Sequence, residues 1–205
     1  DIKHEDDDIV VLNKAPGITV HPGINQQTDE TFLINGLVHR YGVDGLSNLQ
    51  GDWCPGIVHR LDRDTSGLMV VCRNNEAHES LKEQLKQKAM ARQYYAIVKG
   101  SMKECEGDVT KPILRHHKQH HKMTTSDDPN VGKHARTVWR RDKTFRIKKD
   151  EYTAVHLRLD TGRTHQIRVH MCSIGHSIVG DPLYSRKHSR YSNLMLTANM
   201  LALYH

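Results

Sequence analysis

The sequence predicts an α+β fold, because some segments carry the period of strands and others the period of helices. Residues 134–141 and 153–160 alternate apolar and polar side chains, as strands with one buried face do. Residues 31–41 and 76–88 instead repeat apolar side chains every three or four positions, which is typical of helices that pack on a core. We expect the two alternating segments to be antiparallel neighbours in one sheet.

Size and charge narrow the classes of function. A chain of 205 residues suits a single domain over residues 1–205, of one body or two lobes, and can bury a core. The net charge of +6 and the pI near 9.1 indicate an anionic partner, with nucleic acid as the first candidate, and the basic residues gather in positions 111–149. Because the sequence begins at Asp1 rather than Met, we expect a domain of a longer chain, without any N-terminal RNA-binding module.

The cysteines are far apart and form no CxxC pair, so the sequence favours neither a zinc ribbon nor a disulfide framework. Free cysteines fit the reducing cytoplasm, where we expect the protein to work. The chain also has no apolar run long enough to cross a bilayer, and we expect no membrane contact. The four cysteines are Cys54, Cys72, Cys105 and Cys172.

Two short strands are predicted in the first third of the chain. Residues 67–72 form an apolar run bounded by turn residues, and residues 9–12 form a shorter one. Asp62 lies just before the longer run, between Arg60 and Arg63, whose positive charges favour the ionised carboxylate. The turn-forming run DTSG then fixes the direction of the loop. The sequence therefore presents Asp62 as an anion on a firm support.

The two amphipathic segments have the marks of core-packed helices. Gly42 is placed to end the first of them as a C-terminal cap. The apolar stripe of the second holds Ala77, Leu81 and Leu85, while charged residues fall on its other sides. Both helices are expected to serve the structure rather than the chemistry.

Residues 94–98 favour a strand by composition. Successive side chains of a strand point to opposite faces, so Tyr94 and Tyr95 are separated. Aromatic residues in strands usually pack in the core. The local sequence by itself therefore favours a core position for Tyr94. We expect Tyr95 to be the better core candidate.

A third helix is predicted after Thr164, which can act as its N-terminal cap. Ile167 and Met171 share one face of this helix, and Gly175 ends it. Arg168 lies about a quarter turn from the apolar stripe. We therefore expect Arg168 at the rim of that stripe, partly buried, with its guanidinium aimed into a cleft.

The histidine-rich segment PILRHHKQHHKM, residues 112–123, suggests a metal site only at first sight. His116 and His120 are four residues apart, as are His117 and His121. A protein metal site needs a third ligand and a closed geometry, and the segment offers neither. We therefore expect no metal.

Two longer motifs carry a resemblance to a known family. HRLDRDTSG, residues 59–67, precedes the apolar run LMVV, and TGRTHQIRVH, residues 161–170, opens the third helix. Both resemble signatures of the RluA-type pseudouridine synthases, which isomerise uridines in RNA. NKAPG, residues 13–17, resembles a further motif of that family, which usually reads NKPAG. His120 stands where the family usually has Arg, and Thr197 where His is common.

The resemblance implies the pseudouridine synthase fold, a mixed, mainly antiparallel sheet in two lobes with flanking helices and a central cleft. It implies three catalytic residues: Asp62 as the reacting carboxylate, Arg168 as its partner, and Tyr94 as the ring that stacks on the target base. Arg60 is expected near the flipped uridine, and a basic arm is expected to grip phosphate. His170 is expected behind the site or on the RNA backbone. The residues expected to bind RNA are Arg60, Arg115, Lys122, Lys133, Arg163 and His165.

The implied reaction breaks the bond between the uracil nitrogen and the ribose, rotates the base and rejoins it through carbon-5. One carboxylate suffices, either as a nucleophile or as the base that deprotonates the ribose, and the sequence leaves both routes open. The uridine must first be flipped out of folded RNA. The resemblance implies no cofactor, and we expect a monomer that acts on RNA, with large-subunit ribosomal RNA as the first substrate.

Two other classes of function stay open. A non-catalytic RNA-binding or ribosome-assembly module explains the charge but leaves Asp62, Tyr94 and Arg168 without a joint role. A glycoside hydrolase would use two carboxylates, here Asp62 and Asp64, one of them kept protonated at neutral pH. The flanking arginines oppose such protonation, and a chain with two Trp offers few aromatic rings for a sugar site.

Overall fold

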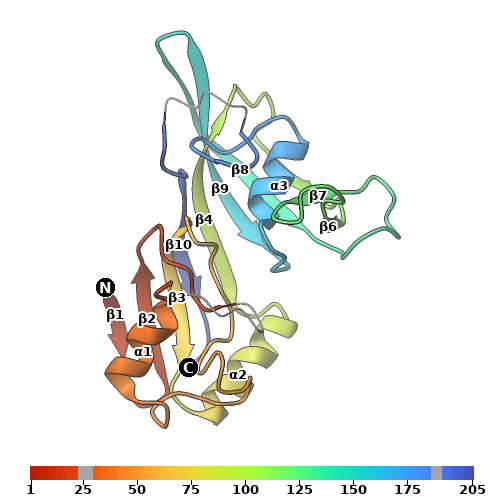
Figure 1. Cartoon of the computed structure of the whole chain (residues 1–205). Coiled ribbons are helices and arrows are strands. Elements are labelled where there is room, and N and C mark those ends of the chain that lie inside the picture. The colour runs from red at the N-terminus through yellow and green to blue at the C-terminus, as the bar shows by residue number, and fades with distance from the viewer. Residues whose placement is uncertain (23–29, 186–190) are drawn as a thin grey trace. The chain divides into compact units, whose positions relative to one another are not determined.

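The chain divides into two compact units (Figure 1). The first unit holds Asp1–Met90 and Ala198–His205, and the second holds Ala91–Thr197. Both ends of the sequence therefore belong to the first unit. The predicted single domain over the whole chain stays a prediction. The computed structural model describes residues 1–22, 30–185 and 191–205.

The strands of the first unit come from both ends of the sequence. β2 (Ile9–Lys14) pairs antiparallel with β1 (Ile2–Glu5) on one side and with β3 (Ser66–Cys72) on the other. The strand that follows β3 in this order is β10 (Leu196–Ala202), whose residues from Ala198 onward belong to the unit. The two strands predicted in the first third of the chain, β2 and β3, are confirmed.

Both predicted helices of the first unit are confirmed (Figure 1). α1 (Leu33–Tyr41) ends at Gly42, whose φ of +73° lies in a region that glycine adopts without strain. α2 (Asn75–Lys86) begins after Asn74, whose side chain accepts a hydrogen bond from the Ala77 amide at 2.8 Å. Each helix therefore has a boundary set by one local residue.

A hydrophobic core joins α2 to the strands of the first unit. Leu81 of α2 is buried against Ile9 of β2 and Val70 of β3. Ala77 and Leu85 flank it as partly buried members of the same cluster, which is the stripe expected from the sequence. Each fully buried aliphatic side chain of this kind contributes roughly 1.5–3 kcal/mol to stability. This core gives β3 a rigid position at the end of the loop that carries Asp62.

The second unit is built on four antiparallel strands in the order β4, β9, β8 and β5. The pairing of β8 with β9 confirms the predicted antiparallel neighbours, although β8 begins at Thr137 rather than at residue 134. The bounds of the four are Ala91–Lys99, Asp150–Leu159, Thr137–Ile147 and Glu106–Val109.

A short hairpin and a helix complete the second unit. β6 (Ile113–Arg115) pairs antiparallel with β7 (Met123–Thr125). α3 (Gln166–Ser173) lies beside this hairpin (Figure 1), and its Val169 shares a small buried cluster with it. The two strands of the hairpin are held in register by the pairs Ile113 with Thr125 and Arg115 with Met123.

The two faces of strand β4 differ in burial, which decides between Tyr94 and Tyr95. Tyr94 is buried, with 6% of its surface exposed, whereas Tyr95 is half-buried and donates a hydrogen bond to Asp142 at 2.6 Å. The prediction that Tyr95 is the better core residue is wrong. The register with β9 places Tyr94 opposite the buried Leu157 and Tyr95 opposite the half-buried His156. The apolar face of β9 thus decides which tyrosine is enclosed.

These elements make an α+β structure in which the paired strands described above are antiparallel, as predicted. All four cysteines are free thiols, as expected. Within the described stretches, the helices are too short or too polar to span a bilayer. The predicted cleft between two lobes stays a prediction.

Gly67 in β3 tests the packing of the first unit. Its φ is +116°, and a Cβ atom there would stand 2.2 Å from the carbonyl oxygen of Ala198. Gly67→Ala should lower the free energy of unfolding by at least about 2 kcal/mol, through backbone strain and the clash. Gly36→Ala in α1 is the matched control, because a Cβ there meets nothing within 4 Å.

The control should raise the free energy of unfolding by about 0.5–1 kcal/mol, since alanine favours a helix over glycine. Urea unfolding followed by circular dichroism measures both variants. Equal midpoints for the two would contradict the close approach of β3 and β10.

Candidate active site

The loop that carries Asp62 is held at two points in the first unit. After Asp62 the loop closes in a turn, in which the Thr65 amide donates to the Asp62 carbonyl oxygen at 3.2 Å. Before it, the His59 ring accepts a hydrogen bond at Nε2 from the Val70 amide of β3, at 3.1 Å. Asp62 itself is half-buried. The residue is therefore presented between a turn and a strand rather than on a loose loop.

A buried lysine ties this loop to the end of β2. Lys14 is 2% exposed, and its Nζ donates to the carbonyl oxygens of Ala15, Ile18 and Arg63 at 2.8, 2.9 and 2.8 Å. A protonated ammonium has three N–H donors, one for each of these carbonyls. The Gly17 amide also donates to the Arg63 carbonyl, at 2.9 Å. The residue after the candidate carboxylate is therefore fixed by two donors.

Burial lowers the pKa of Lys14 from its ordinary value of 10.5 to about 8, and the negative charges of Asp64 and Asp62 oppose this shift. At pH 7 most of the ammonium therefore stays protonated and keeps its three donors. Lys14 acts on the loop through the backbone and is a positioning residue for Asp62.

Arg60 lies on the surface of the first unit beside an aromatic pair. Its Nη1 is 3.3 Å from Nε2 of His21. The Nδ1 atom of His21 is 2.7 Å from the Pro22 carbonyl and donates to it, so Nε2 accepts from Arg60. Burial lowers the pKa of His21, and the Arg60 charge adds to this, which keeps the ring neutral. The His21 ring meets Trp53 edge-on, with 5.1 Å between centroids, and Trp53 is 42% exposed.

In the second unit, the motif TGRTHQ fixes the start of α3. The side-chain oxygen of Gln166 accepts from the Arg163 amide at 3.0 Å and from the Thr161 hydroxyl at 2.7 Å. α3 begins after His165, which has a left-handed φ of +55°. The prediction that Thr164 caps this helix is wrong, because the turn runs one residue further and is closed by the Gln166 side chain.

Arg168 has a buried partner that the sequence analysis missed. Its Nε and Nη2 donate to Oδ2 and Oδ1 of Asp181, at 2.8 and 3.0 Å, in a bidentate ion pair. The side chains are 4% and 0% exposed, so the predicted rim position of Arg168 is wrong. A buried charge requires a compensating partner, and Asp181 supplies it. The amides of Leu183 and Tyr184 also donate to Asp181 Oδ1, which fixes the carboxylate in turn.

Tyr184 links α3 to the hairpin. Its hydroxyl accepts from the Met123 amide of β7 at 2.8 Å and lies 2.9 Å from Nδ1 of His165. Its ring faces the Arg168 guanidinium, with 5.3 Å between Cζ and the ring centroid. The structure therefore brings two predicted site residues, His165 and Arg168, together on one tyrosine.

Arg163 and His170 differ in exposure. Arg163 is exposed, and its Nε donates to the His134 carbonyl at 3.0 Å. His170 is fully buried between the Thr137 hydroxyl and the Lys111 carbonyl, at 2.9 Å from each. Burial lowers the pKa of His170, which keeps the ring neutral. His170 therefore packs in the interior, and its expected alternative place on the RNA backbone is wrong.

The basic arm consists of the β6–β7 hairpin and the segment at Lys133. The His116 amide donates to the Lys122 carbonyl at 3.0 Å, which closes the hairpin beside Arg115. Lys133 and Ile113 exchange two backbone hydrogen bonds, at 2.8 and 2.9 Å. Arg115 and Lys133 are exposed and Lys122 is half-buried. The three predicted basic residues thus belong to one arm.

Two histidines of the arm, His116 and His117, make contacts within the turn between β6 and β7. Nδ1 of His116 accepts from the amides of Lys118 and Gln119, at 3.2 Å each, and the ring stacks on His117 with 5.0 Å between centroids. Over the described residues, the one set of three metal-ligating side chains that converges lies in the first unit, outside this arm.

Tyr94 and Arg92 lie on the same face of β4, two residues apart. The Arg92 guanidinium approaches the TGRTHQ turn, where a Cβ on Gly162 would stand 2.9 Å from its Nη1. Burial lowers the pKa of Arg92, and Tyr94 and Asp160 oppose this shift. The second unit therefore gathers β4 and the TGRTHQ turn around the guanidinium of the half-buried Arg92.

The predicted catalytic residues are divided between the units. Asp62 and Arg60 belong to the first, and Tyr94 and Arg168 belong to the second. The predicted meeting of Asp62 with Arg168 and Tyr94 stays a prediction.

The sequence analysis missed three residues that hold these groups in place, Lys14, Asp181 and Tyr184. Lys14 lies in the motif NKAPG, whereas Asp181 and Tyr184 lie in the segment GDPLY, residues 180–184, which follows α3. A lysine that directly ends an apolar strand is a signal for a buried ammonium. The Asp-Pro pair in GDPLY is a turn signal that we did not connect with Arg168.

Comparison with known proteins gives one family. The family described as RNA pseudouridylate synthase matches residues 8–173. The chain is 42% identical over 206 residues to the uncharacterized RNA pseudouridine synthase YlyB of Bacillus subtilis (strain 168), covering 100% of this chain and 64% of the relative. It is 45% identical over 184 residues to the ribosomal large subunit pseudouridine synthase D of Xylella fastidiosa, covering 90% of this chain and 51% of the relative.

A solved structure shares the fold. The human RNA pseudouridylate synthase domain containing 1 superposes with a TM-score of 0.77 at 25% identity, covering 98% of this chain and 76% of that one. This likeness confirms the predicted fold. The chain spans about three fifths of the length of the first curated relatives that it matches.

Lys14 gives a prediction about stability and pH. Between its folded pKa of about 8 and its ordinary value of 10.5, the unfolded chain holds a proton that the folded chain has lost. The free energy of unfolding therefore rises with pH across this window. Relative to the non-titrating Lys14→Met variant, the wild type should gain on the order of 1–2 kcal/mol between these pH values, after allowance for solvent screening.

Urea unfolding of both proteins at several pH values measures the difference. Titration of other groups cancels in the comparison, because they are shared. A difference that stays flat or falls as the pH rises would contradict the lowered pKa of Lys14.

Proposed function

The chain belongs to the RNA pseudouridylate synthase family, and on that premise we propose that it isomerises uridine to pseudouridine in RNA. The observation that carries this proposal is the Asp62 loop, fixed by its turn and by Lys14. Because several relatives are named for the large ribosomal subunit, we propose large-subunit ribosomal RNA as the substrate. We propose a monomer at work in the cytoplasm, whose reducing conditions suit four free cysteines.

Asp62 is the proposed reacting group. Its carboxylate either attacks the ribose carbon and forms a covalent intermediate, or removes a ribose proton to give a glycal, and either route frees uracil to rotate. The base then rejoins through carbon-5, which gives up its proton. The overall reaction is an isomerisation, with no net oxidation or hydrolysis.

Arg168 is the proposed partner of the Asp62 carboxylate. Two of its nitrogens are already bound to Asp181, which fixes the plane of the guanidinium before RNA arrives. Because Asp181 offsets most of the positive charge, Arg168 acts on Asp62 chiefly as an oriented hydrogen-bond donor. This role requires the forked donor geometry of a guanidinium in addition to a positive charge, and lysine cannot reproduce that geometry.

Tyr94 is the proposed stacking partner of the target uracil. The ring is buried, so stacking requires it to become accessible when RNA binds. Base-on-aromatic stacking contributes roughly 1–3 kcal/mol, which helps to offset the cost of a few kcal/mol for flipping the uridine.

Two surfaces are proposed to hold the RNA. The first unit offers Arg60 beside the exposed indole of Trp53, joined through His21. The second unit offers the basic arm with Arg115 and Lys133 exposed. Phosphate contacts made by such residues weaken as salt rises, and aromatic contacts are less sensitive.

Replacement of the reacting group is the first test of the activity. Asp62→Asn should lower pseudouridine formation by roughly a thousandfold or more, because the amide is neither a nucleophile nor a base. The measurement is tritium release from RNA that carries uridine labelled at carbon-5. Binding of the same RNA should be retained, since the substitution removes a negative charge.

Asp64→Asn is the matched control and should keep most of the activity. Equal loss in both variants, with release of free uracil by the wild type, would instead favour a hydrolase that uses two carboxylates. No tritium release by the wild type would favour a non-catalytic RNA-binding module.

Trp53 provides a test of the RNA surface. Trp53→Ala should weaken RNA binding by about 1–3 kcal/mol, which is roughly 5- to 150-fold in Kd, because a stacking platform is lost. Trp53→Phe should keep most of the affinity. Leu49→Ala removes another exposed apolar side chain of the same loop and should leave Kd unchanged. Similar losses for Trp53→Ala and Leu49→Ala would indicate a general effect on the loop and contradict stacking.

A further inference from the structure

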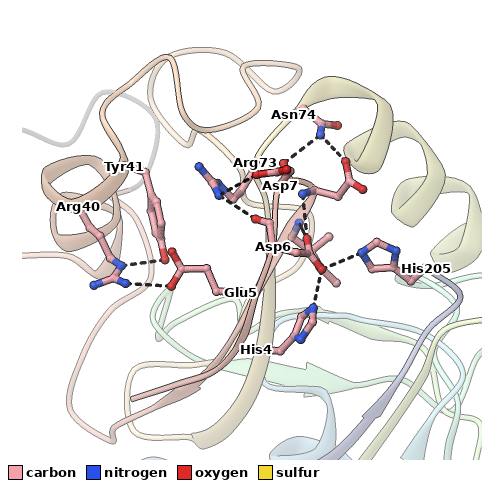
Figure 2. Close-up of polar contacts among 11 residues, drawn as sticks. His4, Glu5, Asp6, Asp7, Arg40, Tyr41, Arg73, Asn74 and His205 are labelled. Carbon is pink, nitrogen blue, oxygen red and sulfur yellow. Dashed lines mark hydrogen bonds and ion pairs between the residues drawn. The ribbon is translucent and has the colours of Figure 1, made fainter.

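A second group of reactive side chains lies in the first unit, where β1 meets the segment that follows β10. It contains His4 of β1, Asp6 of the turn between β1 and β2, and His205 (Figure 2). Figure 2 shows both imidazoles directed at the same carboxylate of Asp6. These residues take no part in the proposed isomerase chemistry.

The three possible ligand atoms lie close enough together to share one metal ion. Nε2 of His4 lies 2.5 Å from Oδ2 of Asp6, and Nε2 of His205 lies 3.0 Å from the same oxygen. The three atoms are all within 4.8 Å of one another. Ligand atoms on a tetrahedral zinc ion are roughly 3.3 Å apart, given bonds of about 2.0–2.1 Å. Small side-chain shifts would therefore place all three around one ion.

The carboxylate is oriented before any ion binds. Oδ1 of Asp6 accepts hydrogen bonds from the amides of Ile9 and Asp8, at 2.8 and 2.9 Å. The backbone carbonyl of Asp6 accepts from Nη1 of Arg73, at 2.7 Å. These contacts hold one carboxylate oxygen and direct the other, Oδ2, toward the histidines. Such outer contacts of a ligand are typical of metal sites.

The neighbouring charges are engaged elsewhere. Arg40 forms an ion pair with Glu5 at 2.9 Å and a hydrogen bond with the Tyr41 hydroxyl (Figure 2). Asp8 accepts from the Asn74 side chain at 2.7 Å. Lysine and arginine are therefore absent from the contacts of the Asp6 carboxylate among the described residues, and its side-chain partners there are the two histidines.

We propose that His4, Asp6 and His205 form a binding site for a divalent transition-metal ion such as Zn²⁺. Two imidazole nitrogens and one carboxylate oxygen suit zinc and its neighbours, whereas calcium and magnesium prefer sets of oxygen ligands. The histidine side chains are about half-exposed, which gives the ion a path from solvent and leaves a coordination position for water.

The site joins parts of the chain that are far apart in sequence. His205 and Asp6 are 199 residues apart, and the ion would fasten the segment after β10 to the turn between β1 and β2. Because the unfolded chain lacks this arrangement, binding favours the folded first unit. The expectation that the protein binds no metal came from the histidine-rich arm, and this site is independent of that arm.

Titration of ZnCl₂ into the 205-residue chain tests the site, with calorimetry for affinity and Co²⁺ absorption for tetrahedral geometry. His4→Ala and His205→Ala should each weaken binding at the tight site at least tenfold, because loss of a ligand costs no less than loss of an outer contact, which is about 10–100-fold. His39→Ala removes an exposed histidine of α1 and is the matched control. It should bind the ion as the wild type does.

Asp6→Asn supplies a further variant, because its amide oxygen can still accept from the backbone amides while the charge is lost. It should also weaken binding, and far-ultraviolet circular dichroism should stay that of the wild type. Unchanged affinity in His4→Ala or His205→Ala would overturn the proposal. So would the lack of saturable Zn²⁺ binding by the wild type.

Discussion

The ammonium of Lys14, enclosed by three carbonyl oxygens, is the contact on which the candidate chemistry of the first unit depends. The loop that carries Asp62 has no regular ladder to satisfy its backbone, so its carbonyls need other donors. Lys14 supplies them from the end of β2, a strand fixed by its pairing with β1 and β3. These hydrogen bonds therefore fix the loop to the strands of the first unit. The backbone of Asp62 itself is positioned by the turn, in which its carbonyl oxygen accepts from the Thr65 amide.

In the second unit, the side chain of Arg168 is positioned by a buried ion pair. Arg168 and Asp181 neutralise each other inside the unit, and Tyr184 completes the contact through its ring. A buried pair of this kind adds little net stability, because desolvation offsets most of the attraction. Its value lies in geometry, since it fixes the guanidinium in one plane. In each unit, a buried ion thus fixes the position of a group that is proposed to take part in the reaction.

The sequence predicted those parts of the structure that depend on local pattern. Period alone located α1, α2 and the β8–β9 pair, and a quoted motif located the Asp62 loop. The predictions from sequence were wrong where the contact partner of a residue lies far away in the chain. Tyr95 was expected to be the better core residue, but Tyr94 is the more buried of the two because the apolar face of β9 decides which side of β4 is buried. Arg168 lies deeper than expected because its partner, Asp181, comes from a later turn. Contacts between the ends of the chain, such as that of His205, leave no local signal at all.

The Asp62 carboxylate and the Arg168 guanidinium are proposed to act on one flipped uridine, although they belong to different units. The most direct measurement is a crystal structure of the Asp62→Asn variant bound to a substrate RNA. The account predicts an extruded uridine whose ribose lies against residue 62, with Arg168 in hydrogen-bond contact with that side chain and the uracil on Tyr94. A uridine that stays stacked in its helix, or one bound with residue 62 and Arg168 at separate places, would contradict it.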